Sequence, residues 1–471
     1  MADYNVIVIG AGPGGYVAAI RCAQLGMKTA CIDKWHHADG RYVLGGTCLN
    51  VGCIPSKALL DSSHHYYHLK HQSAEHGIRC PELSIDISAM QARKETIVKT
   101  LTQGIEGLFK KNKITQLKGQ GRLVSAHEIE ITDSSGQTTL VSAEHIILAT
   151  GSVPANLPAL PIDQKFIVDS TGALAFESVP QRLGIIGAGA IGLELGSVWS
   201  RLGSEVTILE ALPDFLAFAD RKIATVALKE FKKQGLDIRL GTTVTTTEIS
   251  NNEVKLLYKN EKGEQTLNVD KLIVAVGRKP YTENLNLEAL GIKTDERGFI
   301  PVNAHRQTTV PNIYAIGDVI GGPMLAHKAS EEGVLVAERI AGQKSEMHYD
   351  HVPWVIYTVP EIAWVGKTEE QLKATGIEYK VGQFPFMASG RAKAQGETSG
   401  MVRMIADAKT DRLLGVHIFG STASELISEA VLAMEFEASA EDLARTIHAH
   451  PTLTETLHEA ALGVDQRTIH A

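Results

Sequence analysis

The pattern of apolar and polar residues predicts two similar α/β stretches, followed by a region of different character. Near the start, the apolar run Val6–Ile9 predicts a buried strand by its length and β-branching. An alanine-rich stretch to about Gly26 predicts a helix, and an apolar run ending at Asp33 predicts a second strand. Much later, the segment RLGIIGAGAIGLELGSVWSRLGSEVTILE repeats this layout and ends at Glu210.

Three further apolar runs predict strands that lead into glycine-bearing turns. They are HIILATGSVP, KLIVAVGRKP and NIYAIGDVIGG, and the third places Asp318 directly after its strand. Asp318 has two interpretations: an acceptor for a ribose or ribityl hydroxyl, or an ordinary turn or N-cap aspartate, which is favoured on the residue alone. From residue 348 the pattern changes. WVIYTVPEIAWVG and RLLGVHIFG are typical of strands, and helices follow from about Glu425.

Each α/β stretch carries G-x-G-x-x-G between its first strand and its helix. In such a pattern the first glycine permits a tight turn, and the second lets a pyrophosphate approach the helix N-terminus. The third permits close helix–strand packing, and a carboxylate after the second strand accepts from ribose hydroxyls. The two sets are Gly10, Gly12, Gly15 and Asp33, and Gly187, Gly189, Gly192 and Glu210, with the acid at the same offset in both.

We therefore predict an α/β fold with two Rossmann-like dinucleotide-binding domains and a C-terminal α+β domain. The predicted segments are 1–150, 151–276, 277–347 (a return to the first domain) and 348–471. Glu210 indicates the cofactor of the second site, because a carboxylate there repels a 2′-phosphate. The following residues, ALPDF, offer no arginine. The second site is thus expected to prefer NAD to NADP.

Composition excludes several classes of function. The chain has 471 residues, and its 46 basic and 54 acidic residues give a net charge of −8, without the basic surplus of a nucleic-acid or anionic-membrane binder. No apolar run approaches the ~20 residues of a membrane span. The N-terminus shows no basic region typical of a secretory signal. Five cysteines are too few for a disulfide scaffold, so we expect a reducing compartment.

The stretch GGTCLNVGCIPSK spaces Cys48 and Cys53 awkwardly. In a regular helix two residues five apart point in different directions, so pairing requires a distorted turn that includes Gly52 and Pro55. The sequence leaves four interpretations open: a redox-active disulfide, a structural disulfide, two reduced core cysteines, or half a zinc site. The last lacks a second ligand pair at suitable spacing among the other cysteines.

With two dinucleotide motifs, this cysteine pair, YAIGD and HAHPTLTE, the chain resembles the flavoprotein disulfide reductases over essentially its full length. CLNVGCIPSK and the acidic Glu210 are most similar to the branch that oxidises dihydrolipoamide with NAD. Two features depart from the usual pattern: Asp33 stands where glutamate is commoner, and the loop 34–43 is longer. We interpret the loop as an insertion near the adenosine end of the first nucleotide.

The resemblance implies FAD in the first site, NAD in the second, and a redox-active Cys48–Cys53 disulfide at the start of a helix. Such a position lowers the pKa of a thiol. Cys48 is then the thiol that meets substrate sulfur, and Cys53 the one that meets the flavin, with Gly45 and Gly46 letting the segment approach the ring. Further cofactor contacts implied by the resemblance are Lys57 with its partner Glu194, Gly121, Thr150, Gly151, Gly277, Asp318, Met324, Ala326 and His327.

HAHPTLTE supplies the base that thiol–disulfide exchange requires. Pro451 fits the first position of a helix, which would place His450 near its N-cap and Glu455 within the first turns. Glu455 would orient the imidazole of a general base. The resemblance further implies that His450 acts in the partner subunit's site, so that the last domain is a dimerisation domain. His448, by contrast, is expected to cap or lie on the surface.

The predicted activity is oxidation of protein-bound dihydrolipoyl groups, with a lipoylated carrier of a 2-oxo acid dehydrogenase or glycine cleavage system as partner. Reduction of a small disulfide such as glutathione by NAD(P)H is the alternative within the enzymes, and a flavoprotein retained as a scaffold is the alternative outside them. No metal, nucleic acid or membrane is expected to bind. The expected location is the bacterial cytoplasm, or the mitochondrial matrix if the chain is a mature eukaryotic form.

Overall fold

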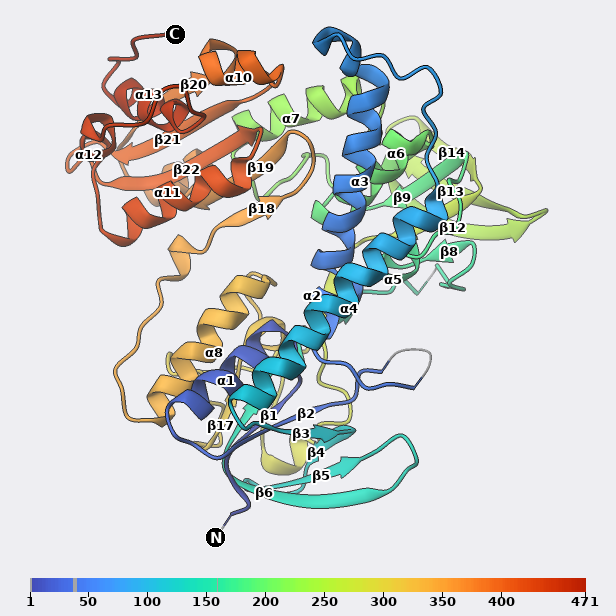
Figure 1. Ribbon diagram of the computed structural model, residues 1–471, viewed down its shortest axis with the longest axis vertical. Coiled ribbons are helices and arrows are strands. Elements are labelled where there is room, and N and C mark those ends of the chain that lie inside the picture. The colour runs from blue at the N-terminus through green and yellow to red at the C-terminus, as the bar shows by residue number, and fades with distance from the viewer. Residues whose placement is uncertain (1, 37–39, 159) are drawn as a thin grey trace. The chain divides into compact units, whose positions relative to one another are not determined.

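The computed structural model describes residues 2–36, 40–158 and 160–471 (Figure 1). The chain forms two compact units, each assembled from three separate segments. Unit 1 comprises Met1–Ala58, Ser88–Ala155 and Gly277–Met347. Unit 2 comprises Leu59–Ile87, Asn156–Val276 and His348–Ala471. The four-segment domain division made from the sequence stays a prediction.

Unit 1 is built on a seven-stranded mixed sheet with the order β3-β2-β1-β6-β5-β4, in which β17 also pairs with β6. The pairs among β3, β2, β1, β6 and β17 are parallel, whereas β4, β5 and β6 form an antiparallel meander. The strands are β1 (Tyr4–Ile9), β2 (Thr29–Asp33), β3 (Thr115–Lys118), β4 (Gln120–Leu123), β5 (Glu128–Thr132), β6 (Thr138–Leu148) and β17 (Ile313–Ala315).

Helices α1 (Pro13–Gln24) and α8 (Ala326–Ile340) of unit 1 cross closely. A Cβ atom on Gly333 of α8 would lie 2.6 Å from the carbonyl oxygen of Gly14 in α1, so only glycine allows this approach. Buried residues of both helices join Val6 and Val8 of β1 in one apolar cluster, while Ile7 and Ile9 on the opposite face of β1 join a second cluster, so β1 is apolar on both faces. The first glycine motif is therefore held between a rigid sheet and a tightly packed helix pair.

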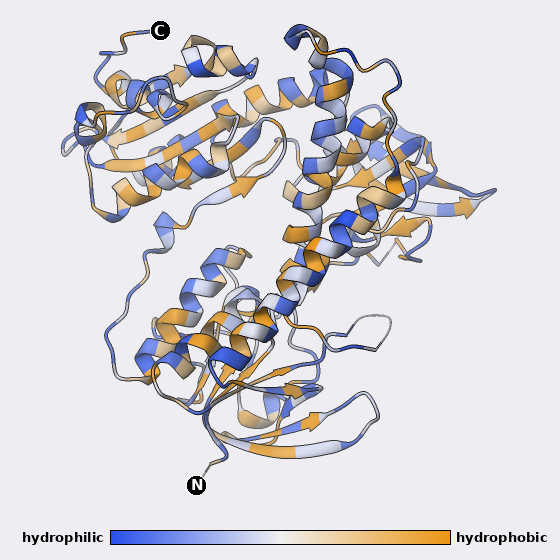
Figure 2. Ribbon diagram, in the orientation of Figure 1, coloured by the Kyte–Doolittle hydropathy of each residue, from blue (hydrophilic) through white to orange (hydrophobic). Residues whose placement is uncertain are grey.

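The long helices α3 (Cys53–His71) and α4 (Ile87–Lys111) carry apolar and polar residues along their whole length (Figure 2). The short helix α2 (Gly46–Val51) precedes α3 directly. Strand β7 (Ser152–Pro154) pairs antiparallel with β16 (Arg278–Pro280), so the two similar sequence segments that end in GSVP and GRKP contact each other.

Unit 2 contains a five-stranded parallel sheet with the order β11-β10-β9-β15-β8, and a three-stranded antiparallel sheet β12-β13-β14. Helices α5 (Ser170–Ala173), α6 (Ala190–Leu202) and α7 (Arg221–Lys233) accompany them. The strands are β8 (Ile167–Val168), β9 (Arg182–Ile186), β10 (Glu205–Leu209), β11 (Asp237–Arg239), β12 (Thr243–Ser250), β13 (Glu253–Asn260), β14 (Gly263–Val269) and β15 (Lys271–Val274).

The C-terminal part of unit 2 is an antiparallel sheet, β18-β19-β22-β21-β20, that shares one apolar core with helices. The helix predicted to begin at Pro451 is α13, but it begins at Glu455, so that prediction was wrong by four residues. The elements are β18 (Trp354–Ile356), β19 (Glu361–Gly366), α9 (Glu369–Thr375), β20 (Tyr379–Pro385), α10 (Gly390–Gln395), β21 (Met401–Asp407), β22 (Leu413–Gly420), α11 (Ala423–Glu435), α12 (Ala440–Arg445) and α13 (Glu455–Val464).

These sheets confirm the predicted α/β class with a differently built C-terminal region. Among the described residues, none of the helices combines the length and the apolar character needed to cross a membrane.

Candidate active site

The first glycine motif forms the turn from β1 to α1. Gly10 has φ +103°, which favours glycine, and a Cβ on Gly15 would lie 1.8 Å from the Gly10 carbonyl oxygen. Gly12 is the N-cap of α1 and provides no side-chain cap, so the first N–H groups of the helix remain available to an anion. A Cβ on Gly12 would meet only the Cα of Gly46, at 4.0 Å. The turn is an open cradle of the kind a pyrophosphate requires.

The second motif repeats this geometry in the turn from β9 to α6. Gly187 has φ +102°, and a Cβ on Gly192 would lie 2.0 Å from the Gly187 carbonyl oxygen. Gly189 is the uncapped N-cap of α6, and a Cβ there would have no neighbour within 4 Å. Because both turns expose a helix N-terminus beside a residue without a side chain, both fit a dinucleotide.

The two predicted acidic residues also make equivalent contacts. Asp33 accepts hydrogen bonds from the backbone N–H of Ala11 (2.6 Å) and of Trp35 (2.7 Å). Glu210 accepts from Ala188 (2.8 Å) and Leu212 (2.9 Å). Each carboxylate thus fixes its own glycine turn from the end of the neighbouring strand.

Burial raises the pKa of Asp33, although its backbone donors act in the opposite direction. A ribose hydroxyl would be a further donor to this carboxylate. Glu194 lies in α6, where it accepts a hydrogen bond from the backbone N–H of Tyr357 at 3.0 Å. Because Lys57 and Glu194 belong to different units, their predicted pairing stays a prediction.

The cysteine pair lies at the junction of two helices in unit 1. Cys48 is the third residue of α2 and is half-buried, while Cys53 is the first residue of α3 and is exposed. Neither cysteine forms a disulfide in this structure, and their side chains are hydrogen-bonded to each other. The structure therefore holds the pair as a dithiol, and the predicted disulfide is the oxidised form of two side chains already in contact.

Glycines shape the backbone around the pair. Gly52 separates the two helices, and a Cβ there would lie 2.8 Å from the Thr47 carbonyl oxygen and 3.1 Å from the Cα of Cys48. A Cβ on Gly46 would lie 2.6 Å from the Cα of Gly12. The backbone beside the cysteines thus packs directly on the first glycine turn, a contact that the sequence analysis did not foresee.

The electrostatics of the pair correct one prediction. The hydrogen bond to Cys53 raises the pKa of Cys48, burial raises it further, and the nearby charge of Lys57 acts in the opposite direction. The general expectation of a lowered thiol pKa is therefore wrong for Cys48 in the dithiol. Cys48 lies inside α2 rather than at the start of α3, and its thiol is hydrogen-bonded to the neighbouring sulfur.

The flavin-side residues predicted by resemblance lie in unit 1. Thr150 Oγ1 donates to the Tyr281 carbonyl oxygen at 2.6 Å, and Gly151 follows with φ +71°. Asp318, in the short helix Gly317–Ile320, accepts from the hydroxyl of Ser152 at 2.5 Å, and Arg278 donates to the same hydroxyl at 2.7 Å.

The remaining predicted residues differ in their surroundings. Gly121 is buried in β4, where a Cβ would lie 3.4 Å from the side chains of Ile9 and Ile32, so packing alone accounts for it. Gly277 has φ +113° and precedes β16. Met324 precedes α8, and Ala326 and His327 are the first residues of that helix. The contacts of these residues with a cofactor stay predictions.

A buried ion pair that the sequence analysis missed holds the turn that carries Asp318. Lys328 Nζ donates to the carbonyl oxygens of Gly317 (3.2 Å) and Gly321 (3.0 Å) and lies 3.4 Å from Glu332. Glu332 accepts from the N–H of Gly317 at 2.7 Å, and both side chains are almost fully buried. The sequence did indicate that these two residues could pair, since a lysine and a glutamate four apart in one helix lie on the same face.

The His450–Glu455 contact predicted from the sequence is present in unit 2. His450 Nδ1 lies 2.8 Å from Glu455 Oε1, and Glu455 Oε2 accepts from the N–H of Thr452 at 2.8 Å. Partial burial would raise the pKa of Glu455, but the Thr452 and His450 hydrogen bonds hold it below its usual range. The His450 side chain is 78% exposed, so it is presented to the outside of its own chain. His448 contacts Glu429 at 2.6 Å and its side chain is only 7% exposed, so the expected cap or surface position is wrong.

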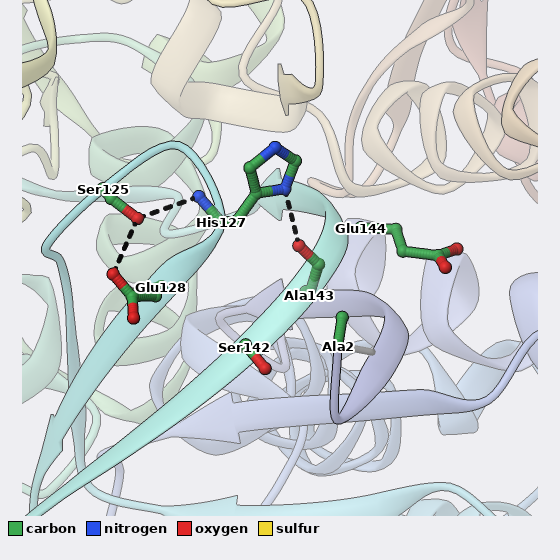
Figure 3. Close-up of a pocket in the computed structure, with 7 residues that line it drawn as sticks. All are labelled: Ala2, Ser125, His127, Glu128, Ser142, Ala143 and Glu144. Carbon is green, nitrogen blue, oxygen red and sulfur yellow. Dashed lines mark hydrogen bonds between the residues drawn. The ribbon is translucent and has the colours of Figure 1, made fainter.

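Two other features lie apart from these residues. A pocket of about 490 Å³ beside strands β5 and β6 is lined by Ser125, His127, Glu128, Ser142 and Glu144 among others (Figure 3), and none of the predicted site residues lines it. The longer loop 34–43 includes residues 37–39, which lie outside the described part of the chain.

Comparisons with known proteins agree with one another over nearly the whole chain. Residues 4–333 match the family described as pyridine nucleotide-disulphide oxidoreductase, and residues 352–461 match its dimerisation domain. A dihydrolipoyl dehydrogenase of Cupriavidus necator is 55% identical over 99% of both chains. The mitochondrial dihydrolipoyl dehydrogenase of Homo sapiens is 49% identical over 98% of this chain and 90% of its own. Among solved structures, the Escherichia coli flavoprotein disulfide reductase RclA in its Cu(II) complex superposes with a TM-score of 0.86, at 30% identity over 98% of this chain and 99% of its own.

Proposed function

The chain belongs to the pyridine nucleotide-disulphide oxidoreductase family, and on this premise we propose that it is an FAD- and NAD-dependent dihydrolipoyl dehydrogenase. The observation that carries the proposal is the pair Cys48 and Cys53, whose thiols contact each other beside the first glycine turn. Relatives of that name cover the full length of the chain, so the alternative of a reductase for small disulfides is not favoured.

The residues present fit both cofactors. FAD is assigned to the cradle of Gly10, Gly12 and Asp33, and NAD to that of Gly187, Gly189 and Glu210. Asp318 is expected to bind the ribityl part of the flavin, and the buried Lys328–Glu332 pair holds its turn in place. When bound, the two cofactors supply the acceptors for the electron pair that the dithiol releases.

The chain's own groups perform the sulfur chemistry. His450, oriented by Glu455, removes a proton from one thiol of the dihydrolipoyl substrate. The resulting thiolate attacks Cys48 of the oxidised pair, the S–S bond breaks, and Cys53 leaves as thiolate. The second substrate thiol, once deprotonated, attacks the mixed disulfide and displaces Cys48. The substrate leaves as a lipoyl disulfide, and the protein retains two electrons as a dithiol.

The base acts from a second subunit. His450 is exposed on its own chain, and residues 352–461 match a dimerisation domain, so His450 of the partner subunit is assigned to the cysteine pair. The proposed partner is a lipoylated carrier of a 2-oxo acid dehydrogenase or glycine cleavage system. The proposed location is the bacterial cytoplasm, in keeping with the Cupriavidus relative, with the mitochondrial matrix as the alternative.

A comparison of two substrate pairs tests the proposal. The purified, flavin-containing protein should turn over dihydrolipoamide with NAD faster than glutathione disulfide with NADPH, and the reverse order would refute it. Cys48→Ser should abolish dihydrolipoamide oxidation while the protein still binds flavin, because Ser cannot form the mixed disulfide. A scaffold protein would lose none of its role in this variant.

A further inference from the structure

Three side chains typical of metal ligands meet in unit 2, and none of them has a role in the proposed reaction. His348 immediately precedes the short helix Tyr349–His351, and Glu435 is the last residue of α11. His348 Nδ1 lies 2.9 Å from Glu435 Oε2, and His351 Nδ1 lies 3.1 Å from Oε1. One ligand atom from each residue lies within 4.8 Å of the others. We propose that this His–His–Glu cluster binds a divalent cation of the zinc class, a property that goes beyond the proposed function.

The donor set and spacing match such an ion. Zinc binds imidazole nitrogen and carboxylate oxygen at about 2.0–2.2 Å, so neighbouring ligands of a tetrahedral ion lie about 3.3 Å apart. The two nitrogen–oxygen distances are close to this value before any adjustment. Two imidazoles and one carboxylate suit zinc, copper or nickel, whereas magnesium and calcium prefer oxygen ligands. The fourth position is left for water.

A second observation concerns His351. Its side chain is only 14% exposed, and its buried Nδ1 lies 3.1 Å from Glu435 Oε1 without the geometry of a hydrogen bond. Buried polar atoms normally have a partner, and a cation coordinated by Nδ1 and the carboxylate would provide one.

The acidic residue between the two histidines, Asp350, is already paired. It accepts a hydrogen bond from Lys367 Nζ at 2.6 Å. The site is therefore built from three ligands rather than from a general acidic patch. A bound cation would link His348, the first residue of the last segment of unit 2, to the C-terminal end of α11. We thus expect the cation to stabilise this part of unit 2.

Calorimetric titration of the oxidised, flavin-containing protein with zinc chloride tests the proposal, because oxidation keeps the thiols of Cys48 and Cys53 from competing. We expect one zinc ion per chain and a zinc-dependent rise in the unfolding temperature. His348→Ala and Glu435→Gln should each weaken binding by about tenfold or more. His348 is 61% exposed, so its replacement is expected to leave the fold intact, which circular dichroism checks.

The matched control is His470→Gln. His470 also contacts a glutamate, Glu459, at 2.6 Å, but it belongs to no three-ligand cluster among the described residues. This variant should bind zinc as the wild type does. The proposal is overturned if the wild type binds no zinc, or if His348→Ala and Glu435→Gln bind it unchanged. It is also overturned if Cys48→Ser abolishes binding, because the ion would then be held by thiols.

Discussion

The Gly192→Ala substitution tests whether the second glycine turn depends on backbone contact. A Cβ at this position of α6 would lie 2.0 Å from the Gly187 carbonyl oxygen and 3.3 Å from the Ile185 side chain. The matched control is Gly104→Ala in α4, where a Cβ would meet nothing within 4 Å. Both changes replace a helical glycine by alanine, so their intrinsic helix propensities change alike.

The two substitutions should have effects of opposite sign. Alanine in a helix stabilises the folded protein by about 0.5–1 kcal/mol relative to glycine, and this stabilisation is the whole effect expected at Gly104. At Gly192 the overlap with a backbone oxygen forces the helix start away from the turn by about an ångström, at a cost of about 2–3 kcal/mol, the upper part of the range for overpacking. The net destabilisation is about 1–2 kcal/mol, or roughly a 5- to 30-fold change in the opening equilibrium.

Amide hydrogen exchange measures each region separately. In Gly192→Ala the segment 182–209 should exchange roughly 5- to 30-fold faster and NAD affinity should fall, while flavin content stays at the wild-type level. In Gly104→Ala the segment 87–111 should exchange more slowly. Unchanged exchange and NAD affinity in Gly192→Ala would refute the claim that this contact shapes the nucleotide site.

Two further outcomes follow from the contacts in unit 2. His450→Gln should lower kcat for dihydrolipoamide oxidation by about 10²- to 10⁴-fold, because the general base is lost; a near-normal kcat across the pH range would contradict its role. Arg403→Met should cost about 3–5 kcal/mol in denaturant unfolding, because it leaves the fully buried Asp220, bound at 2.5 and 2.7 Å, without its cation. Burial acts to raise the pKa of Glu369, but the Arg403 hydrogen bond lowers it overall. The Glu369 carboxylate therefore stabilises the folded protein above its unfolded pKa of about 4.3, and this stabilisation is lost as the pH falls through the lower folded pKa. The difference in the free energy of unfolding between the wild type and Arg403→Met should therefore become smaller in acid.

The glycine motifs were predictable because their chemistry is local. The positive φ at Gly10 and Gly187, and the contacts that exclude a side chain at Gly15 and Gly192, all arise within one strand–turn–helix unit. The His450–Glu455 contact was predictable for the same reason, since five residues separate the two.

Features that depend on longer-range packing were not predictable. The start of α13 is an exception, because its cause is local: the sequence suggested that Pro451 begins a helix, but Glu455 binds both His450 and the N–H of Thr452, which keeps this segment in a turn until α13 begins. The packing of Gly46 on Gly12 joins two loops whose apolar patterns are unrelated. The His348–Glu435 contact joins residues more than 80 positions apart, and no spacing rule indicates it.

The order in which the segments of unit 1 are synthesised determines when its sheet can be completed during translation. Strand β6 ends at Leu148, but its parallel neighbour β17 begins only at Ile313, so roughly 160 residues intervene. At about 5–20 residues per second, a ribosome needs roughly 10–30 s to deliver the missing strand. During this interval one edge of β6 is unpaired at Ile146–Leu148, where it can pair with chaperones or with other chains. Stable flavin uptake is therefore expected only late in translation or after release.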